Sequence, residues 1–230
     1  MIVNSASIFA NSLKFDVCFS VHAIPKRKKC LSLAKNKKTD EYRILNNFEE
    51  KLQQELLHLC TNYGMLDSTL LAADDIDNRW HDLAPEYVAD AVGQIRDYPV
   101  VSVAWAAYLG LGVAFGWDED WEYYAQVSYQ SYYGEQGFDD MDEHIVRDLL
   151  QLPLDSKEAG QLEDIIRRCG QATVSMIRHE QIEPQSPMAF HVFARACRTM
   201  FRIGAAIELK RLGYKFEKIE LGRNLNELPS

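Results

Sequence analysis

The chain has 230 residues, of which 47% are hydrophobic and 26% charged, with 34 acidic and 25 basic side chains. This composition is that of a globular protein of one or two domains, which excludes a disordered or fibrous chain. The charge is unevenly divided: residues 1–38 hold eight Lys or Arg and one Asp, a net +7, which leaves 17 bases and 33 acids, a net −16, for residues 39–230. An acidic body of this size excludes duplex nucleic acid as its partner, because phosphate binding needs clustered Lys and Arg.

The first 38 residues show no sustained helical or strand period. We therefore predict a basic, poorly ordered extension in front of a single domain at residues 39–230. The first basic residue is Lys14 and Asp16 follows it, a pattern unlike that of a secretory signal. We expect the extension either to bind an anionic surface or to pair with the acidic body.

Five cysteines are spread along the chain, and no two of them form a Cys-x-x-Cys pair; they are Cys18, Cys30, Cys60, Cys169 and Cys197. This spacing indicates neither a zinc site nor a disulfide framework. We predict reduced, mostly buried thiols in a cytoplasmic protein, and no cofactor.

Helical periodicity begins at Thr39. Apolar residues then recur at steps of three and four, and Gly64 is placed to end the helix; the apolar positions are Leu45, Phe48, Leu52, Leu56 and Leu59. A second helix is predicted over residues 85–95, beginning at Pro85.

The stretch from Tyr98 to Trp117 contains no charged residue. Its length is the minimum for a membrane span, about 20 residues, and Gly112 and Gly116 have the small-xxx-small spacing of packed membrane helices. The same features suit the central, fully buried helix of an all-helical protein, with Pro99 in its first turn. We favour this second interpretation, with a central helix at residues 99–116, because no basic cluster flanks the stretch.

The remaining sequence predicts four more helices and a short tail. One begins at Asp118 as its cap and runs to about residue 133, and another covers residues 139–152. Asp155 and Glu158 fit a capping box that opens the next, and Ser186 followed by Pro187 opens the last, which ends at Gly213. The expected fold is thus all-α, a compact bundle of about seven helices with negligible β structure.

Acidic clusters and a few histidines suggest a metal site as one hypothesis. Glu55 and His58 form the only Glu-x-x-His match in the chain, and His144 follows a run of acids that begins at Asp139. Both acidic clusters also coincide with predicted helix starts, where carboxylates stabilise the helix without any metal.

His81 and Asp82 form an adjacent pair that is similar to the metal-binding pair of the HD-domain phosphohydrolases, an all-helical family. The resemblance covers this dipeptide alone. It implies a metal-dependent hydrolase in which His58 and either Asp140 or Asp148 complete the site. The alternative, which we favour, is that Asp82 caps the helix that Pro85 begins and that His81 lies on the surface.

Two surfaces are candidates for binding. On the last predicted helix, a basic stripe falls within about 60° of arc at 100° per residue; its members are His191, Arg195, Arg198 and Arg202. This stripe would receive an anionic ligand or an acidic partner helix, or it would pair with an acidic helix of the same chain. Two tyrosines, Tyr123 and Tyr133, are not explained by a core role and are candidates for an interface.

No catalytic motif for nucleophilic or phosphate chemistry is present. The sequence therefore favours a non-enzymatic cytoplasmic interaction or scaffold protein that self-associates or binds a protein partner, without a membrane. A metal-dependent hydrolase and a single-span membrane protein are the alternatives.

Overall fold

The computed structural model of the chain describes residues 27–215, with side chains from residue 40 onward. Most of the predicted basic extension and most of the predicted tail lie outside these residues. The first helix begins at Arg27 rather than at Thr39, so the part of the extension that the structure describes is helical.

Residues 27–215 form six α-helices and no strand, which confirms the all-α class with one helix fewer than expected. Two 3₁₀ turns, η1 (Tyr129–Tyr132) and η2 (Phe138–Asp140), and one π-helical turn, η3 (Ile145–Leu149), lie between the longer elements. The α-helices are α2 (Arg27–Asn62), α3 (Asp74–Gln94), α4 (Pro99–Tyr124), α5 (Met141–His144), α6 (Lys157–His179) and α7 (Pro187–Arg211).

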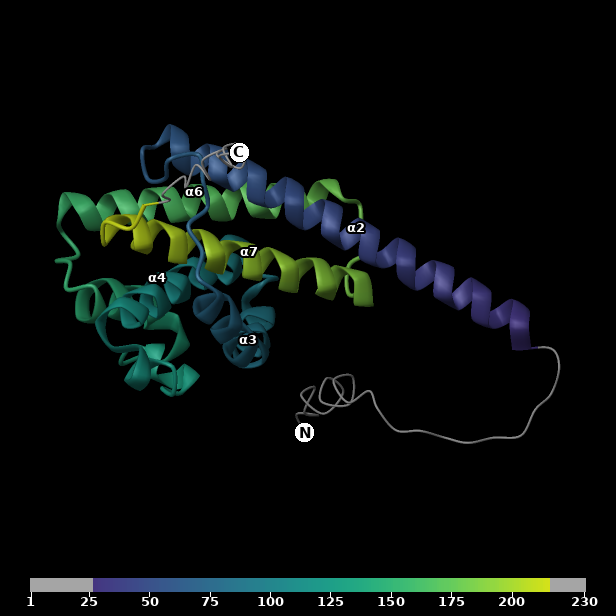
Figure 1. Ribbon diagram of the computed structural model, residues 1–230, viewed down its shortest axis with the longest axis horizontal. Coiled ribbons are helices and arrows are strands. Elements are labelled where there is room, and N and C mark those ends of the chain that lie inside the picture. The colour runs from purple at the N-terminus through teal and green to yellow at the C-terminus, as the bar shows by residue number, and fades with distance from the viewer. Residues whose placement is uncertain (1–26, 216–230) are drawn as a thin grey trace, which may run out of the picture. The chain divides into compact units, whose positions relative to one another are not determined.

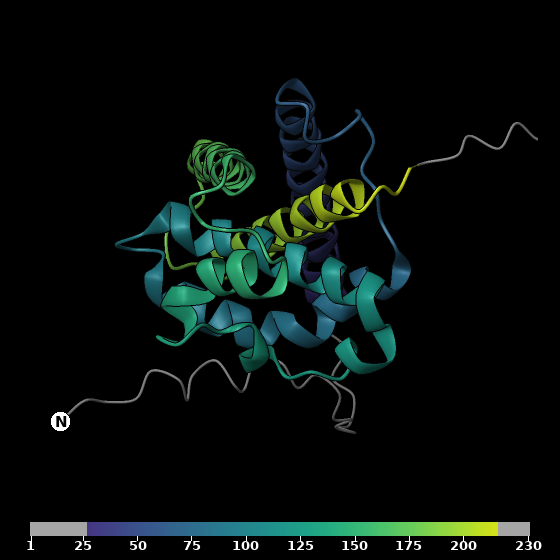
Figure 2. The same ribbon diagram turned by 90° about the vertical axis from the view of Figure 1, so that its left-hand side faces the viewer.

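Helix α4 is the core of the part that the structure describes. Residues 102–114 are buried without interruption, and α3, α6, α7 and the turn η3 all pack against the helix. Helix α7 packs against α4 and also contacts α6; Figures 1 and 2 show these helices from two directions. Helix α4 is long and apolar enough to cross a membrane, yet 78% of its most apolar window is buried inside the molecule.

The closest approach in this core is between the backbones of α4 and α7. A Cβ atom on Gly110 would overlap the carbonyl oxygen of Phe201 and lie 2.9 Å from the backbone nitrogen of Ala205. A Cβ atom on Gly204 would in turn overlap the carbonyl oxygen of Ala107 and lie 2.8 Å from its Cα. Each helix therefore contributes one glycine and one carbonyl group to a reciprocal crossing that no side chain can enter.

The two glycines that suggested helix–helix packing in the sequence have a different role. A Cβ on Gly112 would lie 3.2 Å from the ring of Tyr132, and a Cβ on Gly116 would lie 2.6 Å from Cδ1 of Tyr124. Both glycines therefore make room for aromatic rings: Gly112 for Tyr132 of η1, and Gly116 for Tyr124 in the last turn of α4.

Replacing Gly110 or Gly204 with Ala should destabilise the fold strongly, because the added methyl group must push two backbones apart. We expect a loss of at least about 3 kcal/mol from each substitution, at or above the usual cost of overpacking. Thermal and urea unfolding would measure it.

The matched control for these variants is Gly160→Ala in α6, where a Cβ would meet nothing within 4 Å. We expect this variant to gain about 0.5–1 kcal/mol, since Ala is the better helix former. Unchanged stability of the Gly110→Ala and Gly204→Ala variants would contradict the close crossing.

The second helix begins well before the predicted position, at Asp74, and Pro85 lies inside it. Buried Ile76, Trp80, Leu83 and Tyr87 have helical spacing on both sides of the proline, so their burial outweighs the lost backbone hydrogen bond. The prediction that residues 81 and 82 precede the helix was therefore wrong.

The helix predicted to start at Asp118 was also wrong in its bounds. Helix α4 continues to Asp120, whose φ of −160° and ψ of 86° interrupt it. The Asp120 carboxylate accepts a hydrogen bond from the backbone N–H of Tyr123 at 3.2 Å, as an N-cap does. The cap is therefore Asp120, and only one helical turn follows before the chain enters η1.

The helix predicted over residues 139–152 is instead divided into η2, α5 and η3 and ends at Leu149. The remaining boundaries are close to prediction. Ser186 accepts a hydrogen bond from the N–H of Ala189 at the start of α7, and Gly64 and Gly213 take the positive φ of helix ends. The cap of α6 is Ser156, one residue after the predicted Asp155.

Candidate functional site

The predicted arginine stripe on α7 is paired within the chain. Arg195 and Arg198 both contact the carboxylate of Glu49 on α2, the latter at 3.5 Å. Arg202 donates to Gln53 at 2.8 Å and lies 3.2 Å from Asp77 of α3. The stripe thus joins α7 to α2 and α3, which is the internal pairing that the sequence left open.

His191, the fourth member of the stripe, is exposed at the beginning of α7. Its ring meets that of Phe190 edge to face, with 6.0 Å between centroids. The structure therefore separates His191 from the arginine pairs.

Glu49 is the centre of this seam, since its side chain is only 14% exposed and faces two arginines. Glu49→Gln should destabilise the protein by about 1–2 kcal/mol, because it removes the charge between two partly buried cations. Urea unfolding measures the loss. Glu50→Gln, at the exposed neighbouring position, is the control and should change stability by less than about 0.5 kcal/mol; equal effects at both positions would contradict the seam.

The two candidate tyrosines have different surroundings. Tyr133 donates its hydroxyl to Asp90 of α3 and packs against Tyr129 at 5.1 Å between ring centroids, so internal contacts explain it. Tyr123 is 62% exposed and meets the ring of Tyr124 edge to face at 5.1 Å. Only Tyr123 presents most of its surface to the outside.

The candidate metal ligands lie apart. His58 is exposed on α2 beside Asn62, and His81 and Asp82 are exposed on α3, where Asp82 pairs with Arg79 at 3.4 Å. His144 bonds Asp148 instead. Within residues 40–215, no three His, Cys, Asp or Glu side chains are grouped closely enough to hold a metal ion.

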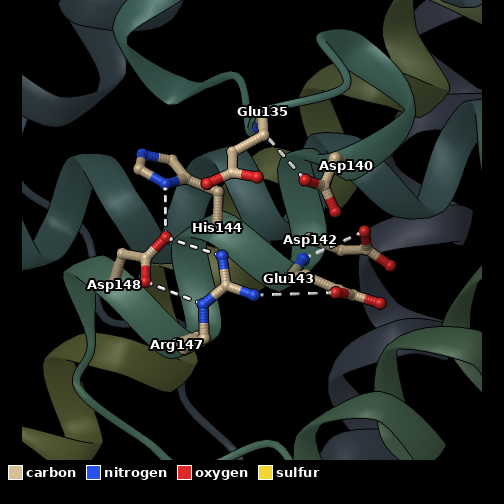
Figure 3. Close-up of polar contacts among 7 residues, drawn as sticks. All are labelled: Glu135, Asp140, Asp142, Glu143, His144, Arg147 and Asp148. Atoms are coloured by element: carbon tan, nitrogen blue, oxygen red, sulfur yellow. Dashed lines mark hydrogen bonds and ion pairs between the residues drawn. The ribbon is translucent and has the colours of Figure 1, made fainter.

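A group of polar contacts lies around η2, α5 and η3 (Figure 3). Residues 135–148 contain six acids and one arginine; we call them the acidic cluster, and its charged members are Glu135, Asp139, Asp140, Asp142, Glu143, Arg147 and Asp148. Arg147 contacts both oxygens of Asp148, at 2.8 and 2.9 Å, and lies 3.8 Å from Glu143. His144 adds a bond from Nδ1 to Asp148 at 2.9 Å. One guanidinium group therefore pairs with two carboxylates, and the acidic cluster keeps a large excess of negative charge.

A tight turn positions the start of this cluster. Gly134 and Gly137 exchange backbone hydrogen bonds at 3.3 and 3.1 Å, and Gly137 takes a φ of 85°, which favours glycine. The carboxylate of Asp140 then accepts a bond from the N–H of Glu135 at 3.1 Å (Figure 3). The π-helical turn η3 follows directly and places Arg147 and Asp148 beside each other on the surface.

Asp142 is half-buried, as is Asp140, whereas the other acids of the cluster are exposed. Desolvation raises the pKa of Asp142, and hydrogen bonds from the backbone N–H of Glu143 and from the side chain of Trp105 oppose that rise. Tyr108 of α4 lies nearby, and burial together with the charge of Asp142 raises the pKa of its hydroxyl. The cluster is thus attached to the central helix through Asp142.

The pKa of Asp148 shifts in the opposite direction to that of Asp142. Hydrogen bonds from Arg147 and then from His144 lower this pKa from 3.8 to about 2. A lowered pKa contributes stability above pH 4, and this contribution is lost as the pH falls towards 2. Arg147→Gln should therefore move the carboxyl titration midpoint of Asp148, followed by NMR, back towards 3.8.

Arg167→Gln is the matched control, since Arg167 pairs with Asp164 on α6. We expect it to leave the midpoint of Asp148 unchanged. A midpoint near 3.8 in the unmodified protein would refute the pairing.

A second polar group joins the end of α7 to α6. Glu208 is fully buried and accepts two bonds from Arg211, at 2.8 and 2.9 Å, while Arg211 also lies 3.4 Å from Glu158. Desolvation raises the pKa of Glu208, and the bonds from Arg211 oppose it. These contacts hold α6 and α7 together, and they pair Arg211 with acids of the same chain.

Sequence reasoning missed the partners rather than the charged residues themselves. The pairing of Glu49 with Arg195 spans 146 positions, so no local pattern reveals it. Glu208 and Arg211 have the i, i+3 spacing of a helical ion pair, which was the available signal for that group.

No protein-family model matches the chain, and comparisons with curated proteins and with solved structures give no match either. Exposed carboxylates around one arginine attract cations and basic chains.

Proposed function

We propose that this chain is a non-enzymatic interaction protein that self-associates, with the basic segment at residues 26–38 of one copy docking on the acidic cluster of another. The supporting observation is the separation of charge. The segment holds seven Lys or Arg and no acid, whereas residues 135–148 hold six acids and one Arg. Opposite charges on two surfaces favour and orient encounter between them.

The internal ion pairs strengthen this proposal, because they account for most basic side chains of the body. The bases paired with acids inside the described part of the chain are Arg79, Arg96, Arg147, Arg167, Arg168, Arg195, Arg198, Arg202, Lys210 and Arg211. The body still keeps a net −16 over residues 39–230, from 17 bases and 33 acids. The basic segment is thus the concentrated positive charge that the chain offers to a negative surface.

Exposed aromatic area beside a second run of acids, at the end of α4, would add affinity to this electrostatic attraction. Tyr123 is 62% exposed and lies among Asp120, Glu122 and Glu119 in the sequence. A tyrosine beside carboxylates offers an apolar face to the stems of Lys and Arg and a hydroxyl to their polar ends.

Sedimentation velocity of the full chain tests this proposal. We expect dimers or larger assemblies at about 50 mM salt and monomers at about 500 mM, because exposed charges are screened within a few ångströms at high salt. A protein that is monomeric at both salt concentrations would contradict the proposal, as would an assembly that salt does not weaken.

A charge exchange identifies the two surfaces. One variant reverses charges in the basic segment, through the substitutions Lys28→Glu, Lys29→Glu, Lys37→Glu and Lys38→Glu. A second variant reverses charges in the acidic cluster, through Glu135→Lys, Asp139→Lys and Glu143→Lys. Each variant alone should be monomeric at low salt, and their mixture should associate. The control variant reverses the charge of three acids elsewhere on the body, Asp155, Glu180 and Glu183. It should associate as the unmodified protein does.

A further inference from the structure

Two cysteines that are far apart in the sequence meet inside the described part of the chain. The sulfur atoms of Cys60 and Cys169 lie 3.6 Å apart, although 109 positions separate the residues. Both side chains are fully buried, Cys60 in the last turns of α2 and Cys169 in the middle of α6. The contact therefore links the helix that carries the basic segment to the outer helix of the body.

The thiols are reduced and adjacent, so a bond between them needs only a small change. A disulfide places its sulfurs about 2.05 Å apart, and rotation about the two Cα–Cβ bonds moves sulfurs over this range. Cys197 is also buried in α7, and among the described residues no hydrogen bond joins its sulfur to that of another cysteine. The arrangement thus singles out one pair.

We infer that Cys60 and Cys169 form a reversible disulfide when the protein meets a peroxide. One thiolate attacks the O–O bond of hydrogen peroxide, which gives a sulfenic acid and releases hydroxide that is protonated to water. The second thiol attacks the sulfenic sulfur, loses its proton, and displaces a second molecule of water as the S–S bond forms. The two sulfurs lose two electrons in total, and the peroxide gains them.

The same bond is opened by a thiol reductant such as glutathione. Two molecules of glutathione return the two protons and two electrons and leave as glutathione disulfide. A disulfide that forms and opens in this way is the kind found in reducing compartments, where lasting structural disulfides are rare.

Burial sets the rate of this reaction. The contact with Cys60, followed by desolvation, raises the pKa of Cys169 far above its ordinary value of 9.0, so little thiolate is present at neutral pH. Oxidation should therefore be slow at pH 7 and faster at higher pH or when the end of α2 opens.

The disulfide would fasten the end of α2 to α6. Cross-linking residues 109 positions apart removes conformational freedom from the unfolded chain, so the oxidised protein should be the more stable form. It would also fix the α2–α6 seam, where Lys51 and Glu55 of α2 and Met176 of α6 line a shallow hollow.

Peptide mapping of the full chain tests the inference. The protein is treated with hydrogen peroxide, its remaining thiols are alkylated in urea, and it is digested without reductant for mass spectrometry. We expect a linked pair of peptides containing Cys60 and Cys169, abolished by glutathione, with Cys197 recovered as the alkylated thiol. The melting temperature should rise by at least about 4 °C on oxidation and fall back on reduction.

Single variants provide the controls. Cys169→Ala should lose both the linked peptides and the rise in melting temperature, and Cys197→Ala should keep both; Cys169→Ser serves if the Ala variant does not fold. Recovery of Cys60 and Cys169 as alkylated thiols after peroxide would overturn the inference. So would linkage of either residue to Cys18, Cys30 or Cys197, or a lower melting temperature of the oxidised protein.

Discussion

The described fold depends on one close crossing, where Gly110 of α4 lies under the carbonyl group of Phe201 and Gly204 of α7 lies under that of Ala107. Backbones this close exclude water and side chains from the centre of the molecule, and the apolar residues of α4 are buried around them. An apolar helix that by length alone would suit a membrane is thereby covered by α3, α6 and α7.

Sequence patterns located the elements that rest on local chemistry. Ser186, Gly64 and Gly213 act where capping rules place them, and the uncharged stretch became the central helix. The patterns failed where a tertiary contact decided the outcome. Pro85 remains inside α3 because buried residues on both sides of it hold the helix. Which glycines meet a backbone, and which meet an aromatic ring, depends on the partner helix and is not encoded at short range.

The charged residues show the same difference between what local sequence reveals and what distant contacts decide. The total excess of acid, the basic segment and the acidic cluster are visible in the sequence. The fate of the α7 arginines is not, because Glu49 and Asp77 come from other helices. Once those arginines are paired internally, the body is left with exposed carboxylates, and this remaining negative charge is the basis of the proposed association with the basic segment.

Native-state hydrogen exchange, measured without detergent, tests the central claim most directly. If the α4–α7 crossing holds the molecule together, the amides around Gly110 and Gly204 should exchange only through global unfolding and should share one free energy of opening. Exchange of α4 through a smaller opening than that of α6, or protection of α4 only in the presence of detergent, would contradict the account.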